Sequence, residues 1–292
     1  VHPPAVTSGA LFSAAALDGG DVIKVMDRQQ ERLAKSIGSG HRVIRGVAGS
    51  GKTLVIVHRA RLLARVMPTK RVLVTCYTRS LASQLRAQLS DLGNIEVRHI
   101  DKLMGDAIRG ADVEHPGYNE GSRKVATAAI QAIQKREPAK YRAVLIDEAQ
   151  DFDTEALQFC VNLLEATDPD EQDLIIVADS AQNIFRKKFA WRDAGVKAQG
   201  RTRLLRTNYR NTREILVFAH TFLTADPHIQ VQQTPDPDDG AAIIPAELSK
   251  RSGPPPTVVD AVAPAGDLSN VLRQAPALAS PKPPFLVVVV VY

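Results

Sequence analysis

The sequence predicts an α/β fold in which a parallel sheet is flanked by helices. From about Val22 to Thr224, short β-rich runs alternate with stretches of helical periodicity, a pattern typical of βαβ units. Several of these runs are continuously apolar, such as VLIDE and LIIVAD, as expected of strands covered on both faces. Twelve of the 18 prolines fall between Pro227 and Pro284, which predicts little regular structure there.

Six runs are expected to form the strands of this sheet. They are His41–Arg45, Arg71–Tyr77, Ile95–Arg98, Arg142–Asp147, Asp173–Asp179 and Arg203–Leu205. A helix is predicted over Leu54–Val66, where apolar residues recur at three- and four-residue spacings before Pro68. The segments that connect the strands are therefore long enough to carry crossover helices.

Two further helices are indicated later in the chain. An apolar stripe at Val125, Ala129 and Ile133 predicts one of them. Asn211, followed three residues later by Glu214, fits an N-cap and its capping partner at the start of another.

The chain is expected to contain one main domain. We assign residues 22–225 to this domain, with a short insertion at about 104–140. Residues 1–21 form an N-terminal extension, and residues 226–292 form a Pro-rich linker or the start of an incomplete second domain. Because the chain begins with Val1 rather than Met, it can be an excerpt of a longer protein.

The composition is that of a globular protein with a basic balance. Lys and Arg number 37 against 32 Asp and Glu, a net charge of +5 that suits a polyanionic partner such as nucleic acid. Cys76 and Cys160 each lie in an apolar run and are interpreted as buried free thiols, which favours a reducing cytoplasm. No signal peptide is recognised, and the apolar run Phe285–Tyr292 is too short to cross a bilayer.

A P-loop pattern, G-x-x-x-x-G-K-[ST], is matched by GVAGSGKT. Glycines let backbone N–H groups converge on phosphates, and the following helix directs its positive N-terminal end at them. A chance match is the alternative, but an apolar strand enters this loop and an amphipathic helix leaves it. The residues expected to bind the triphosphate are Gly46, Ala48, Gly49, Ser50, Gly51, Lys52 and Thr53, with Thr53 also a Mg²⁺ ligand.

Paired acids follow another predicted strand. Asp147 is expected to hold Mg²⁺ through its water shell, and Glu148 to accept a proton from an attacking water. The carboxyl ends of parallel strands are where α/β sheets place their ligands. The alternative is that both acids are solvated and cap a helix that starts near Thr154.

The motifs together resemble the UvrD/Rep-like superfamily 1 helicases. GVAGSGKT, LIDEAQDF, IIVADSAQNIF and LRTNYRNTREIL occur in the order of that family's motifs I to IV. MDRQQERLA is similar to its Q motif, VTCYTRSLASQL to motif Ia and VRHIDKLM to motif Ib, so the likeness covers about two-thirds of the chain. The resemblance implies a RecA-like P-loop NTPase domain that acts with ATP and Mg²⁺ on single-stranded DNA, with 3′-to-5′ movement.

The resemblance also implies roles for residues around the nucleotide. Gln30 is placed at the adenine edge, with Tyr209 stacking on the base and Leu54 where many relatives carry an arginine. Gln182 corresponds to a γ-phosphate sensor, and Arg210 to an arginine finger. Alternatively, Tyr209 and Arg210 only pack and cap before the following helix.

Other residues form an expected track for nucleic acid. Aromatic rings interleaved with cations hold single strands without sequence preference. Trp191 can equally be a core residue. The residues assigned to this track, from the resemblance to motifs Ia and Ib and from the cation-rich stretch before Trp191, are Tyr77, Thr78, Arg79, His99, Phe185 and Trp191.

Departures from the family pattern leave two hypotheses open. Motifs V and VI of a second RecA-like domain are absent, and Ala178 stands where glycine is usual in motif III. The first hypothesis is a motor that needs the missing half for full activity. The second is a nucleotide-gated binding switch that controls a partner or an attached nuclease domain without translocation. RNA rather than DNA remains possible, since base stacking tolerates either polymer.

Overall fold

The computed structural model describes residues 19–117, 121–136, 140–165, 168, 170–179, 191–225 and 251–256. Among them, the side chains of residues 19–27, 220 and 222–225 are not described. Gln182, Phe185 and most of the Pro-rich segment lie outside this part of the chain.

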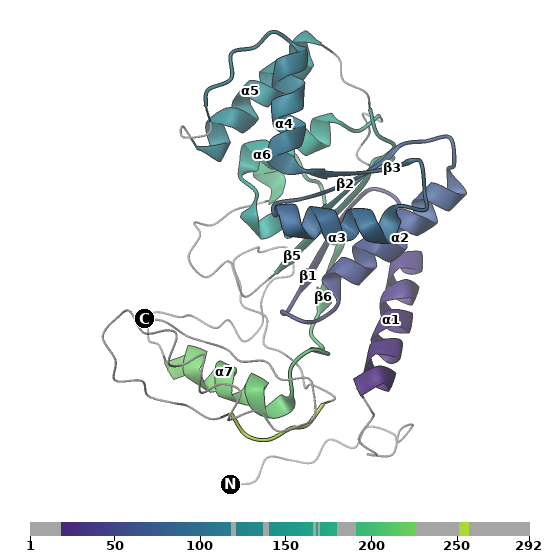
Figure 1. Cartoon of the computed structure of the whole chain (residues 1–292), viewed down its shortest axis with the longest axis vertical. Helices are drawn as coiled ribbons and strands as arrows, with labels where there is room; N and C mark the ends of the chain where they lie inside the picture. The colour runs from purple at the N-terminus through teal and green to yellow at the C-terminus, as the bar shows by residue number, and fades with distance from the viewer. Residues whose placement is uncertain are drawn as a thin grey trace.

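A six-stranded parallel sheet forms the centre of the molecule, which confirms the predicted α/β fold class (Figure 1). The strands lie in the order β3-β2-β4-β5-β1-β6, and every neighbouring pair is parallel. Each strand matches its predicted range to within one residue at either end. They are β1 (His41–Gly46), β2 (Val72–Cys76), β3 (Ile95–His99), β4 (Ala143–Asp147), β5 (Asp173–Asp179) and β6 (Thr202–Leu205).

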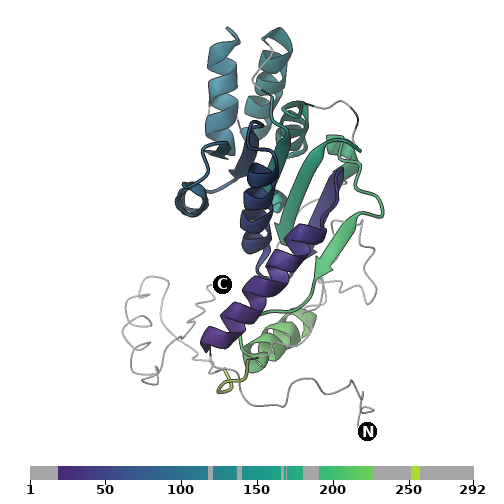
Figure 2. The ribbon, with the colours of Figure 1, turned by 90° about the vertical axis from the view of Figure 1, so that its right-hand side faces the viewer.

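Helices cover both faces of the sheet. Helices α1, α2 and α3 pack on one face, and α4, α5 and α6 gather on the other, as Figures 1 and 2 show from two sides. Figure 2 also shows α1 running beside α2. The helices are α1 (Gly19–Ser36), α2 (Lys52–Val66), α3 (Arg79–Leu89), α4 (Ile100–Gly110), α5 (Ser122–Lys135), α6 (Thr154–Asn162) and α7 (Arg213–Ala225).

Alternation along the four inner strands β2, β4, β5 and β1 supplies two separate hydrophobic cores. In β4, Val144 and Ile146 enter the core shared with α4–α6, while Ala143 and Leu145 enter the core shared with α1–α3. Successive side chains of a strand point to opposite faces, so a continuously apolar run is what a doubly covered strand requires. Burying each large aliphatic side chain contributes about 1.5–3 kcal/mol.

The predicted insertion at about 104–140 is a helical extension of one core. It holds most of α4 and all of α5, which pack against each other, and α5 packs against α6. Its buried residues join the same cluster as the sheet and α6.

The predicted cap of the last helix, α7, is wrong by one residue. Thr212 caps it, because its Oγ1 accepts the N–H of Ile215 at 3.4 Å. Asn211 instead donates its N–H to the Asn208 side chain at 2.8 Å. The Glu214 carboxylate accepts from Ser252 and from the Thr212 side chain, so it contacts the residue that caps the helix rather than Asn211.

Two findings concern the chain as a whole. No helix in the described ranges combines the length and apolar character needed to cross a membrane. Both cysteines are buried and form no disulfide, as their apolar surroundings predicted.

Candidate nucleotide site

The P-loop joins β1 to α2 at the C-terminal edge of the sheet. Gly49 and Gly51 have φ values of 74° and 81°, in the left-handed region that glycine adopts at little cost. Gly51 is the N-cap of α2, and no side chain caps this helix. No side chain therefore competes with an anion in the loop for the first turn of α2, where the positive end of the helix dipole lies.

Lys52 lies buried at the base of this loop. Its Nζ donates to the carbonyls of Gly46 and Val47, both at 3.1 Å, and lies 3.2 Å from Asp179 Oδ2. Asp179 ends β5, which runs between β1 and β4. The lysine charge is thus held by a carboxylate that the sequence did not single out.

Asp147 brings the acids after β4 to the P-loop. Its fully buried carboxylate accepts a hydrogen bond from the Thr53 side chain, and its Oδ1 accepts the Glu148 N–H at 3.0 Å. Burial, together with the nearby charge of Glu148, raises the pKa of Asp147 to about 6, against the opposing effects of Thr53 and Lys52. The P-loop and the paired acids therefore meet in one site.

The residues present fit a Mg²⁺ ion. Asp147 Oδ2 is buried and has no hydrogen-bond partner among the described residues. A divalent cation would satisfy this oxygen, with the Thr53 hydroxyl beside it. No group of three His, Cys, Asp or Glu suited to a metal occurs in the described ranges, but Mg²⁺ bound with phosphates needs only one or two protein ligands.

Glu148 is held in a strained position next to Asp147. Its backbone adopts φ 52° and ψ 44°, a left-handed conformation that costs a residue with a side chain about 1–3 kcal/mol. Gln150 explains part of how it is held. Its Nε2 donates to Glu148 Oε2 at 2.6 Å, while its Oε1 accepts the Asp179 N–H at 2.9 Å. Gln150 thus joins the predicted general base to the end of β5.

The predicted base-binding residues lie beside the P-loop. The buried Gln30 donates its Nε2 to the Ser50 carbonyl at 2.8 Å, so α1 is fastened to the loop. Tyr209, also buried, donates its hydroxyl to Gln29 Oε1, and burial raises its pKa. Leu54 is half-buried in the first turn of α2.

Arg210 lies at the apex of the P-loop. A Cβ placed on Gly49 would approach the Cβ of Arg210 to 2.7 Å, which locates the two backbones in contact. The Arg210 side chain is exposed. Its neighbour Asn208 is buried and hydrogen-bonded to the loop, a feature that the sequence analysis missed.

Two of the residues expected to contact nucleic acid lie together. Tyr77 follows β2 and His99 ends β3, and their ring centroids are 6.4 Å apart. The Tyr77 side chain is 39% exposed. Thr78 has a structural role as well, since its Oγ1 accepts the Leu81 N–H and caps α3, and Arg79 is exposed beside it.

Trp191 is placed in the core, as the alternative interpretation of the sequence held. It begins a short 3-10 helix (Trp191–Ala194), is 9% exposed and belongs to the cluster that includes α6. Its membership of this core cluster favours the structural role for Trp191, and its contact with nucleic acid stays a prediction.

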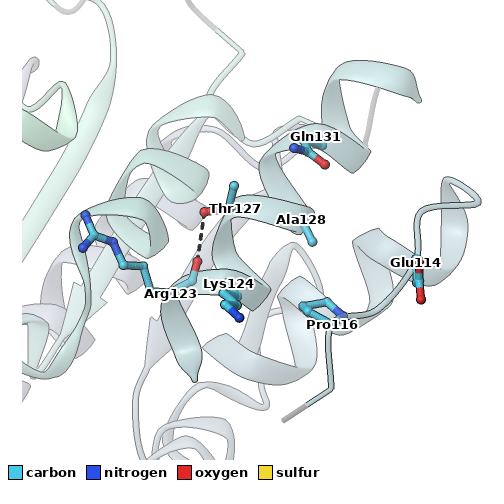
Figure 3. Close-up of a pocket in the computed structure, with 7 residues that line it drawn as sticks. All are labelled: Glu114, Pro116, Arg123, Lys124, Thr127, Ala128 and Gln131. Carbon is cyan, nitrogen blue, oxygen red and sulfur yellow. Dashed lines mark hydrogen bonds between the residues drawn. The ribbon is translucent and has the colours of Figure 1, made fainter. Parts of the chain in front are cut away.

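A shallow pocket of about 320 Å³ lies elsewhere, on the insertion (Figure 3). Residues of α5 and of the segment after α4 line it, and none of the predicted site residues does. Arg123 at its rim is paired with Glu155 of α6 at 2.6 Å. The pocket is therefore separate from the P-loop site.

Comparison with known proteins gives a family and two similar structures. The SWI2/SNF2 ATPase core of Sulfolobus solfataricus, in complex with dsDNA, is 14% identical, with a TM-score of 0.31 over 54% of this chain and 31% of that one. The Pif1 helicase of Candida albicans is 18% identical, with a TM-score of 0.38 over 72% of this chain and 48% of that one. This chain thus spans about a third to a half of their lengths. No curated protein sequence matches it.

The family assignment rests on a longer match. A family model described as an AAA domain (AAA_19) matches residues 29–188, more than half of the chain. The match includes the P-loop, both acids after β4 and the end of β5. The chain therefore belongs to the AAA_19 family of AAA domains, and its described core is a P-loop nucleotide-binding domain.

Proposed function

We propose that this chain is the ATP-hydrolysing motor domain of a helicase or translocase that acts on single-stranded DNA. The observation that carries the proposal is the contact between Thr53 and Asp147, which unites the P-loop with the acids after β4. Chemistry on a bound triphosphate needs both segments at one place, because the protein catalyses it by positioning and electrostatic stabilisation.

Each site residue then has a defined task. Lys52 binds the β- and γ-phosphates, and it can do so by exchanging the Asp179 carboxylate for phosphate oxygens. Glu148, oriented by Gln150, accepts a proton from the attacking water. When bound, Mg²⁺ neutralises phosphate charge, and Thr53 and Asp147 are the residues that would hold it.

The remaining site residues act on either end of the nucleotide. Gln30 and Tyr209 flank the adenine, where burial of Tyr209 and its bond to Gln29 fix the ring. Arg210, exposed at the loop apex, contributes positive charge to the γ-phosphate as it leaves. Gln182 acts as the γ-phosphate sensor that the motif resemblance implies.

The proposed DNA contact lies at the same edge of the sheet. Tyr77 is exposed beside His99, with Arg79 next in the chain, and this pairing of rings with a cation suits a single strand. The UvrD/Rep-like motifs favour DNA and 3′-to-5′ movement. The free, buried cysteines agree with a reducing cytoplasm, and the proposal that it is bacterial rests on the motif resemblance.

The buried ion pair of Lys52 with Asp179 favours a second candidate function. Where phosphate takes the place of Asp179 on the lysine, ATP occupancy changes the contacts of β5 before any hydrolysis. A nucleotide-gated switch that controls a partner or an attached nuclease needs no more than this exchange. Single-molecule tracking separates the two functions. A motor shows directional ATP-dependent displacement on single-stranded DNA or RNA, whereas a switch shows only ATP-dependent residence.

The proposal is tested by the ATPase rate of the full chain with and without single-stranded DNA. We expect stimulation by DNA, and a loss of about 10²–10⁴-fold in Glu148→Gln, which keeps the shape of the general base but not its basicity. Glu165→Gln is the matched control, because the Glu165 carboxylate pairs with Lys70 on the surface, away from the P-loop residues. Unchanged turnover in Glu148→Gln, or a purified protein that ignores ATP, would contradict the proposal.

A further inference from the structure

Asn208 fastens the P-loop to the segment that carries Arg210. It is 1% exposed, and both the nitrogen and the oxygen of its side-chain amide make hydrogen bonds. The Nδ2 donates to the Ala48 carbonyl at 2.7 Å. The Oδ1 accepts the N–H groups of Arg210 at 2.9 Å and Asn211 at 2.8 Å. One planar group thus contacts the loop apex on one side and the backbone of the arginine on the other.

A second set of contacts joins the same two segments. The Tyr209 N–H donates to the Gly49 carbonyl at 3.0 Å. A Cβ on Gly49 would lie 2.7 Å from the Arg210 Cβ and 3.0 Å from Asn208 Oδ1. The absence of a side chain at Gly49 is therefore what allows the approach, in addition to the backbone conformation that glycine permits there.

Only an amide has the required donor and acceptor arrangement at this position. A carboxylate would keep both accepted hydrogen bonds but would face the Ala48 carbonyl without a proton to donate. An alanine would leave the Ala48 carbonyl and two N–H groups without their partner in a buried place, which is costly.

We propose that Asn208 is a positioning residue that couples occupancy of the P-loop to the placement of Arg210. This inference rests on the proposed function, in which Arg210 acts on the γ-phosphate. When phosphates fix Ala48 and Gly49, the Asn208 amide transmits that position to the Arg210 backbone. The arginine is thereby aligned only when the loop is filled.

Two substitutions separate the two halves of the amide. Asn208→Asp keeps the acceptor of the Arg210 and Asn211 N–H groups but loses the donor to the Ala48 carbonyl. We therefore expect the Kd for a fluorescent ATP analogue with Mg²⁺ to rise about tenfold, and kcat to fall by less than about tenfold. In Asn208→Ala both halves are lost, so we expect a similar rise in Kd and a fall in kcat of about a hundredfold, the scale of a displaced catalytic group. Asn162→Asp, at the exposed end of α6, is the control for the added charge and should match the wild type.

A double-mutant cycle with Arg210→Ala tests whether Asn208 acts through the arginine. If it does, Asn208→Ala lowers kcat by less than about twofold in the Arg210→Ala background, because the group it positions is already gone. An equal fall in both backgrounds, or no change of kcat in Asn208→Ala by itself, overturns the proposal. If the alanine variant fails to fold, Asn208→Asp takes its place in the cycle: its smaller fall in kcat should disappear in the Arg210→Ala background, and an equal fall in both backgrounds overturns the proposal.

Hydrogen exchange makes the outcome independent of hydrolysis. A non-hydrolysable ATP analogue should slow exchange of the Arg210 and Asn211 amides in the wild type and should fail to do so in Asn208→Ala. Protection without any hydrolysis by the wild type would defeat the proposed function and support the coupling. Hydrolysis without nucleotide-dependent protection would support the function and defeat the coupling.

Discussion

Asp147 carries a buried negative charge that its surroundings do not fully compensate in the absence of a cation. The raised pKa of about 6, against 3.8 for an ordinary aspartate, means that ionisation favours the unfolded chain. The penalty is therefore fully expressed above about pH 6 and disappears below about pH 4. A shift of this size corresponds to about 3 kcal/mol.

Replacing Asp147 by asparagine is accordingly expected to stabilise the protein and abolish hydrolysis. The asparagine Oδ1 can still accept from Thr53 and from the Glu148 N–H. In denaturant unfolding at pH 7.5 with a chelator, we expect Asp147→Asn to be more stable by up to about 3 kcal/mol, with the difference closing towards pH 4. Mg²⁺ with ATP should stabilise the wild type more than the variant, because the variant keeps the P-loop but lacks one of the two residues that would hold the ion. A variant less stable than the wild type at pH 7.5 would contradict this account of the charge.

Asp91→Asn is a control of opposite character. The Asp91 carboxylate accepts two hydrogen bonds from the surface Arg61, at 2.7 and 2.8 Å, and these lower its pKa. Removing a charge that is favourably placed should not raise stability. A gain in both variants would point to a general effect of lowered net charge instead.

Individual site residues could be predicted where they belong to short contiguous sequence motifs. The P-loop lysine and the acids after β4 follow from short motifs, because adjacent residues build the loop or end the strand. Asp179 was not predicted as the partner of Lys52, since their contact depends on β5 being inserted between β1 and β4. The role of Trp191 was ambiguous for a similar reason, because the burial of an aromatic side chain depends on tertiary contacts and cannot be judged from its neighbours in sequence.

At the scale of elements, the start of α7 is closed by a strap formed from residues 251–253. Ser252 Oγ and the Gly253 N–H donate to the Glu214 carboxylate at 2.6 and 2.9 Å. The Arg213 N–H donates to the Arg251 carbonyl, and Arg251 donates to the Arg210 carbonyl. The strap therefore contacts the Arg210 carbonyl, whereas Asn208 contacts the Arg210 N–H.

Breaking the strap is expected to loosen this end of the site. The hydrogen bond from Ser252 is the main cause that lowers the pKa of Glu214 to about 2, and backbone N–H groups add to it. The stabilisation by the Glu214 charge is therefore complete above about pH 4.5 and is lost only as pH falls towards 2. We therefore expect Glu214→Ala to speed amide exchange at Gly253 by about fivefold to tenfold, equally at pH 6 and pH 8 after correction for intrinsic rates.

The exposed Glu171 provides the control for this experiment, because only its backbone carbonyl accepts a hydrogen bond, from Arg142. Glu171→Ala should leave exchange at Gly253 unchanged. An effect of Glu214→Ala that grew from pH 6 to pH 8 would contradict the assigned titration.

The elements themselves were predictable because strand and helix patterns depend on near neighbours. All six strands were found from apolar runs bounded by turn residues, and the fold class is confirmed. The cap of α7 was misplaced by one residue because Asn211 is recruited by Asn208, a contact made through the bend that precedes the helix. The strap could not be foreseen, since almost forty residues separate Glu214 from its partners.

Across the whole molecule, the sheet places the proposed DNA contact and the ATP site on one edge. The last residue of β2, Cys76, is in register with Asp147 at the end of β4, and Tyr77 comes next in the chain. β3 then adds His99 beside Tyr77. Neighbouring strands therefore connect the two sites through hydrogen-bonded backbone, with no flexible linker between them.

This arrangement predicts that Tyr77 sets how strongly single-stranded DNA stimulates ATP hydrolysis. Stacking of one base on an aromatic side chain contributes about 1–3 kcal/mol, so Tyr77→Ala should raise the DNA concentration needed for half-maximal stimulation by about tenfold to a hundredfold. Measuring the ATPase rate at increasing concentrations of an oligothymidine gives this half-maximal concentration. Raising the salt concentration should weaken DNA binding to the wild type and to Tyr77→Ala. Phe218→Ala is the matched control, because Phe218 is similarly exposed, at 43%, on α7.

If both variants respond to DNA as the wild type does, the DNA strand does not run over β2 and β3. If both weaken alike, the loss belongs to exposed aromatic surface in general rather than to the edge of the sheet beside Asp147.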